Sequence, residues 1–121
     1  MKFRFGILSC AGILAAMAGA ASAEQVSGIL IDKLCVTTTG AKGGQEAVAK
    51  HKRTCNLTAN CSKAGYGVYT ADNKYIAFDS AGNAMAMKAL QESKKVDDMK
   101  VTVTGDLDGD TIKVTDLKLA E

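Results

Sequence analysis

The sequence predicts a mainly β protein, a small OB-like barrel of five strands, and three observations favour this fold class. Five segments rich in β-branched and aliphatic residues are separated by turn-forming residues. One helix-forming segment stands between the third and fourth of these strands, as in OB barrels. Between the first and second strands, the chain inserts a helical stretch that carries its only histidine and two of its four cysteines.

The first 23 residues have the pattern of a cleaved secretory signal peptide. Two basic residues precede an apolar run, and small residues end it at Ala23. The run is too diluted by glycine and alanine for a membrane-spanning helix. Cys10 faintly resembles a lipoprotein cleavage site, but the apolar run continues past it, which favours cleavage after Ala23. We therefore expect residues 24–121 to form one exported bacterial domain, periplasmic or secreted, that does not span a membrane.

The strands follow from local patterns. The aliphatic stretch 26–35 predicts the first strand, the Thr- and Gly-rich stretch 37–44 a loop, and the helix formers of 45–53 a short helix. Residues 56–65 have no clear pattern. A hairpin is expected over 66–79, where Asp and Asn suit the turn.

The second half continues the OB-like order. Residues 80–83 are expected to form a loop and residues 84–95 a helix, whose methionines suit the core better than a metal site. Alternating residues over 99–119 predict a second hairpin that turns at Asp108-Gly109. Its hydrophobic phase slips by one residue at Thr115-Asp116, which indicates a β-bulge.

The cysteines and the histidine suggest a metal site. If the helix that begins at Gln45 runs one turn further, His51 and Cys55 are four residues apart on one face. Cys61 can return from the following loop, and Cys35 ends the first strand. Three thiolates and an imidazole suit tetrahedral zinc, and thiolates also suit cuprous copper.

Asp32 could support this set by orienting His51. Its simpler interpretation is a surface carboxylate at the end of a strand.

A disulfide is the alternative, because thiols in an exported protein tend to pair. Cys55 and Cys61 could close a short loop, or Cys35 could pair with either of them; every choice leaves one thiol over. A third possibility is thiol-redox chemistry, in which His51 lowers the pKa of that odd thiol. The protein would then be a small metal-binding module, a disulfide-stapled domain that contacts an envelope protein, or a redox protein.

Several function classes have no support. Without the two basic residues of the signal peptide, the remaining basic and acidic side chains balance, which argues against a nucleic-acid binder. No phosphate loop or nucleophile elbow is present, and one histidine without a partner carboxylate supports no hydrolytic triad. We therefore expect a binding module and not an enzyme.

The motifs also resemble a group of small exported bacterial domains with an OB-like barrel. The resemblance rests on a G-x-L-x-D-x-x-C opening from Gly28 to Cys35, on the His and two Cys of the insert, and on the "VTVTG" of residues 101–105. It covers nearly all of residues 24–121. It implies export and fold and supplies no activity.

Overall fold

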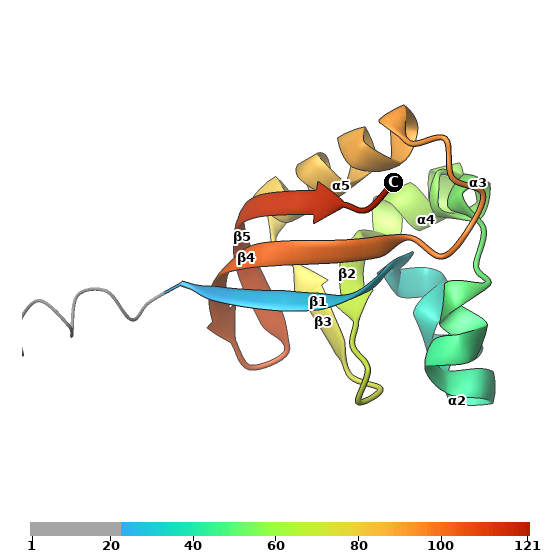
Figure 1. Ribbon diagram of the computed structural model, residues 1–121, viewed down its shortest axis with the longest axis horizontal. Coiled ribbons are helices and arrows are strands. Elements are labelled where there is room, and N and C mark those ends of the chain that lie inside the picture. Colours follow the sequence, from blue (N-terminus) through green and yellow to red (C-terminus); the bar gives the residue numbers. More distant parts are fainter. Residues whose placement is uncertain (1–22) are drawn as a thin grey trace, which may run out of the picture.

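Five strands close into a barrel in the computed structural model, which describes residues 23–121 (Figure 1). The strands are β1 (Glu24–Asp32), β2 (Tyr66–Tyr69), β3 (Tyr75–Phe78), β4 (Lys100–Asp108) and β5 (Thr111–Leu119). Their order around the barrel is β1-β2-β3-β5-β4, and β1 pairs with β4 to close it. The β3–β5 pair is parallel and the other pairs are antiparallel. The predicted OB-like barrel is confirmed.

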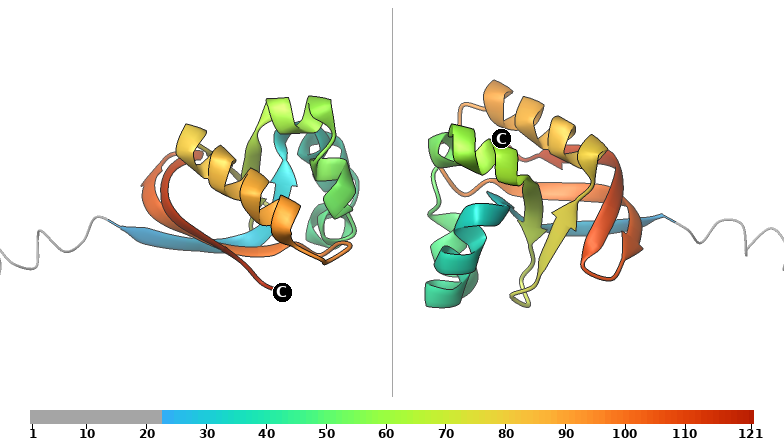
Figure 2. Two further views of the ribbon diagram at one scale, coloured as in Figure 1. Left: turned by 90° about the horizontal axis from the view of Figure 1, so that it is seen from above. Right: turned by 180° about the vertical axis from the view of Figure 1, so that it is seen from behind.

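Within the described residues, the chain also forms four helices outside the barrel strands. They are α2 (Lys33–Ala49), α3 (Arg53–Asn56), α4 (Ala59–Ala64) and α5 (Ser80–Glu92). Three of them form the insert between β1 and β2 and gather at the end of the barrel where β1 finishes (Figures 1 and 2). The fourth, between β3 and β4, lies against β5. A helical insert after the first strand and a helix between the third and fourth strands match the prediction.

The insert is more helical than its sequence predicts. The expected loop at 37–44 lies inside α2, because Asp32 ends β1 and caps the helix: its Oδ2 accepts a hydrogen bond from the Cys35 N–H at 2.8 Å. The helix bends at Gly44, whose φ of +62° favours glycine. The stretch expected to be irregular contains α4.

Two apolar clusters hold these elements together. The barrel interior is filled by strand side chains and closed by Ala86 and Leu90 of α5. A second cluster lies between α2 and the outer wall of the barrel, and contains Ile29, Ile31, Val36, Val48 and Tyr69. Burial of Val36 and Val48 explains why a stretch of poor helix formers is helical.

The remaining elements follow the sequence closely. The two hairpins form over the expected residues, although the second turns at Gly109-Asp110, one residue later than predicted. The ladder between β4 and β5 shifts so that Thr104 faces Asp116 while Gly105 faces Val114. Thr115 is therefore the bulged residue, as predicted. The expected loop at 80–83 is wrong, because Asp79 caps α5 by accepting a hydrogen bond from Gly82 N–H at 3.0 Å.

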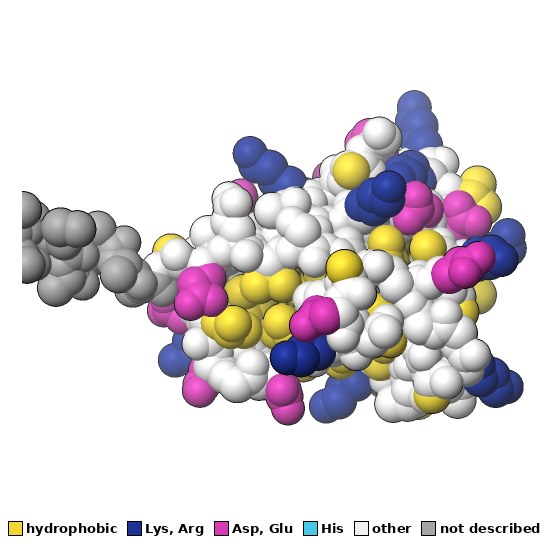
Figure 3. All heavy atoms as spheres, turned by 60° about the horizontal axis from the view of Figure 1, so that its bottom comes forward, with side chains coloured by type: hydrophobic (Ala, Val, Ile, Leu, Met, Phe, Trp, Pro, Cys, Tyr) yellow, Lys and Arg dark blue, Asp and Glu magenta, His cyan; other side chains and the backbone are white. Residues whose placement is uncertain are grey.

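Apolar and charged side chains share the surface. On the face that Figure 3 shows, apolar side chains gather at a hollow, and charged side chains project around it. No helix within residues 23–121 is long and apolar enough to cross a membrane. The predicted signal peptide, with Cys10, lies outside the described residues apart from Ala23.

Candidate metal centre

The pairing of β1 with β2 brings the two halves of the insert together. Asp32, the last residue of β1, faces Tyr66, the first residue of β2. The chain that leaves β1 therefore starts beside the chain that enters β2, and Lys33 N–H donates to Gly65 C=O at 2.9 Å. This topology places Cys35, in the first turn of α2, beside Cys61 in α4.

Three potential ligands meet at this junction. The Sγ atoms of Cys35 and Cys61 lie 3.9 Å apart. Together with a carboxylate oxygen of Asp32, their ligand atoms all lie within 4.8 Å of one another. Cys61 is buried and Cys35 is half-buried, so the group lies just beneath the surface. Asp32, Cys35 and Cys61 are close enough to bind one metal ion.

Asp32 is fully buried, so its interpretation as a surface carboxylate is wrong. Burial by itself would raise its pKa. Hydrogen bonds from the His51 ring, the Cys35 N–H and the Cys61 thiol outweigh this effect and hold the pKa of Asp32 below its ordinary value. The side chain is thus a carboxylate at neutral pH, held inside the protein by donors.

His51 contacts this carboxylate instead of the sulfurs. Its Nε2 lies 3.2 Å from Asp32 Oδ1, and because a carboxylate only accepts, the ring nitrogen donates. Neither ring nitrogen belongs to the group of three ligand atoms. The sequence predicts that His51 is a metal ligand and that Asp32 orients it. In the structure Asp32 lies beside the thiols and His51 orients Asp32.

Cys55 does not join the group. The condition that would place His51 and Cys55 on one helix is not met, because α2 ends at Ala49, before the expected end at residue 53, and His51 lies in the link before α3. Cys55 is in α3 and is exposed. Backbone hydrogen bonds from Arg53 N–H to Val96 C=O and from Asp98 N–H to Ala49 C=O tie this link to the loop before β4.

The Cys35 thiol is held in its protonated form. Burial raises its pKa to about 12, and the negative charge of Asp32 and the neighbouring Cys61 add to this effect. A metal cation would reverse the balance, because it replaces the proton and neutralises the anionic ligands.

Asn56 holds the backbone of Asp32 in place, a role that its sequence context does not predict. It is fully buried, and its Oδ1 accepts a hydrogen bond from the Asp32 backbone N–H at 3.0 Å. Its own backbone C=O accepts a hydrogen bond from the Tyr66 hydroxyl at 2.7 Å. An asparagine in a short polar segment carries no sequence signal for such a role.

Replacing Asn56 by alanine is expected to destabilise the fold by about 1–3 kcal/mol, because the buried Asp32 N–H loses its acceptor. Urea unfolding followed by circular dichroism measures this change. The matched control is Asn60→Ala on the exposed surface of α4, for which we expect a change within about 0.5 kcal/mol. Equal effects of the two substitutions would contradict the role of Asn56.

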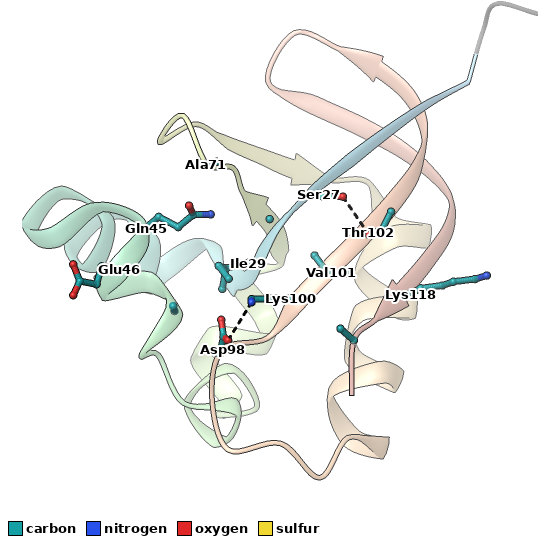
Figure 4. A pocket seen from close by; sticks show the side chains of 13 residues that line it. Ser27, Ile29, Gln45, Glu46, Ala71, Asp98, Lys100, Val101, Thr102 and Lys118 are labelled. Carbon is teal, nitrogen blue, oxygen red and sulfur yellow. Dashed lines mark hydrogen bonds and ion pairs between the residues drawn. The ribbon is translucent and has the colours of Figure 1, made fainter.

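A groove of ≈ 700 Å³ forms a separate feature on the outer face of β1 and β4, with α2 as one wall (Figure 4). Ser27 and Thr102 hydroxyls lie 3.2 Å apart across its floor, and Lys100 pairs with Asp98 at 3.7 Å. None of the cysteines and histidine of residues 23–121 lines it. The candidate metal centre and the groove are therefore built from different residues.

Comparison of the chain with protein-family models, with curated proteins and with solved structures gives no match.

Proposed function

We propose that this protein is a small exported binding module whose ligand is a transition-metal ion, zinc or copper. The proposal is carried by one observation: two thiols and a buried carboxylate have their ligand atoms within 4.8 Å of one another. Thiolate ligands select zinc and cuprous copper over harder ions such as calcium and magnesium. The signal-peptide pattern of residues 1–23 supports export.

Electrostatics support a cation at this place. Burial is the main cause of the raised pKa of Cys35, and the negative charge of Asp32 beside the thiol disfavours the thiolate further. The same carboxylate becomes favourable when a dication lies between the three groups. The arrangement therefore suits a site that exchanges thiol protons for a metal ion.

Serine substitutions test the proposal. Cys35→Ser and Cys61→Ser are each expected to weaken zinc binding by more than about a hundredfold, since even a partner outside the ligand set costs about 10–100-fold when it is removed. Cys55→Ser is the matched control and should bind as the unsubstituted protein does, because its thiol lies outside the group.

Competition with a chromophoric chelator, on reduced protein under argon, measures these affinities. Equal losses in all three serine variants would show that the ion uses Cys55 as well, and the three-residue group would then be wrong. Failure of the unsubstituted protein to bind either zinc or cuprous copper would reject the proposed function.

A disulfide-stapled domain is the second candidate, and the Sγ–Sγ distance of 3.9 Å between Cys35 and Cys61 favours it. In that case the pair is Cys35–Cys61 and the odd thiol is Cys55. The redox candidate has less support, because it requires His51 beside the reactive thiol, whereas His51 Nε2 contacts Asp32 Oδ1 and the pKa of Cys35 is raised.

A further inference from the structure

The geometry points to zinc, bound by three protein ligands: we propose that Cys35 Sγ, Cys61 Sγ and the Asp32 carboxylate hold a tetrahedral Zn²⁺ whose fourth position is taken by water. This inference rests on the proposed function and deepens it by naming the ion and its ligand set. It assigns His51 to the support of Asp32 and leaves Cys55 out of the site.

The distance between the sulfurs is the first argument. With Zn–S bonds of about 2.3 Å and a tetrahedral angle, two thiolates on one zinc ion lie about 3.8 Å apart. Cys35 and Cys61 have their Sγ atoms 3.9 Å apart. A linear two-coordinate ion with bonds of the same length would separate them by about 4.6 Å. The observed distance fits a tetrahedral or a trigonal ion and is too short for a linear one.

The carboxylate is the second argument. A zinc-bound carboxylate oxygen lies about 3.5 Å from each zinc-bound sulfur, so Asp32 needs to approach by at most about 1.3 Å from the 4.8 Å limit. Asp32 Oδ2 accepts from Cys35 N–H and Oδ1 lies against His51 Nε2, and the lone pair that accepts from the Cys61 thiol becomes free for a metal ion once that thiol loses its proton. Carboxylate ligands are common on zinc, whereas cuprous copper prefers sulfur.

The support of Asp32 is the third argument. His51 Nε2 donates to Oδ1 of Asp32, and the Asn56 side chain accepts from its backbone N–H. Partners outside the ligand set commonly fix a zinc ligand in this way. The group found within residues 23–121 supplies three ligands, which leaves the fourth position of a tetrahedral ion open. Because Cys35 is only half-buried, the centre lies near the surface and a water molecule can occupy that position.

The discriminating variant is Asp32→Asn, which keeps an oxygen acceptor for the helix-capping hydrogen bond and removes the charged ligand. We expect its zinc affinity to fall by about a hundredfold or more and its cuprous affinity to change by less than about threefold. Chelator competition measures both ions on the same reduced protein, and circular dichroism checks the fold of the variant. An unchanged zinc affinity, or equal losses for both ions, would overturn the inference.

X-ray absorption of the zinc-loaded, unsubstituted protein gives a measurement that needs no variant. The expected ligand set is two sulfur and two oxygen atoms. A third sulfur would show that Cys55 also binds the ion, and an imidazole pattern would show that His51 does. Either result would overturn the ligand set proposed here. Binding of cuprous copper without zinc would reject this inference and leave the proposed function intact, whereas binding of neither ion would reject both.

Discussion

Oxidised glutathione is expected to join Cys35 to Cys61 in the metal-free protein and to abolish metal binding. The two Sγ atoms are in contact at 3.9 Å, and a disulfide needs them to close to about 2.05 Å. One oxidised glutathione takes up the two electrons and the two thiol protons, and leaves as two reduced glutathione molecules. A disulfide sulfur is no longer a thiolate ligand, so both thiolate ligands are lost in one step.

Intact mass and chelator competition follow this reaction. In the Cys55→Ser variant, which lacks the exposed thiol that would take up glutathione, the mass should fall by two hydrogen atoms. No thiol of residues 24–121 should then remain for alkylation after denaturation, and zinc binding should disappear until reductant is added. The two cysteines lie 26 positions apart, so the cross-link should also stabilise the fold by about 3–4 kcal/mol in the chain-entropy description.

Two variants make the result specific. Cys55→Ser should still form the disulfide, whereas Cys35→Ser should yield only adducts with glutathione. A bond between Cys55 and either partner, or zinc binding that survives oxidation, would contradict the expected pairing. Protection of the unsubstituted protein by prior zinc loading would show that the metal and the disulfide compete for the same two sulfurs.

The barrel could be predicted from the sequence because its signals are local. Alternating residues over 99–119 fix a hairpin, and the phase slip locates a bulge that the structure places at Thr115. The helix predicted between the third and fourth strands then makes the OB-like barrel the favoured arrangement of the five strands. The helix begins at Ser80, four residues earlier than the pattern predicts, because Asp79, which the pattern assigns to the end of a strand, caps it.

The insert was harder to predict because tertiary contacts override its weak local preferences. Thr and Gly favour a loop over 37–44, yet the cap from Asp32 and the burial of Val36 and Val48 make the segment helical. The one available signal was an aspartate at the end of a strand, three residues before Cys35, which has the spacing of a helix cap.

Two of the four ligands predicted from the sequence, Cys35 and Cys61, lie in the candidate site, and Asp32 joins them in place of His51 and Cys55. Sequence spacing suggested that His51 and Cys55 share a helix, but the chain turns after Ala49 and separates their roles. Burial of Asp32 depends on how the insert folds over the end of β1, and on Asn56 behind it. Such long-range contacts leave no periodic trace in a single sequence.

In the reduced, metal-free protein, Cys35 is expected to react with iodoacetamide at pH 8 roughly a thousandfold more slowly than an ordinary cysteine thiol. The reactive species is the thiolate, and burial with the negative charge of Asp32 raises the pKa of Cys35 to about 12. At pH 8 only about one molecule in ten thousand carries this thiolate, whereas an unperturbed thiol is partly ionised. The exposed Cys55 provides a reference site in the same chain.

Peptide mapping after timed labelling separates the three cysteines, and labelling in denaturant should make their rates alike. Asp32→Asn should speed the labelling of Cys35, since it removes a charge that raises the pKa. If Cys35 reacts as fast as Cys55 in the folded protein, the redox candidate regains support and the protonated thiol described here is wrong.

The same raised pKa sets how metal binding depends on pH. A thiol must lose its proton to bind zinc, and Cys35 keeps its proton up to about pH 12 in the metal-free protein. Zinc binding at neutral pH therefore releases this proton, and the affinity should rise at least about tenfold for each pH unit. Burial is the larger cause of the raised pKa of Cys35, and the negative charge of Asp32 adds to it. The same carboxylate lies beside the two thiols, where it would attract the ion that replaces the proton.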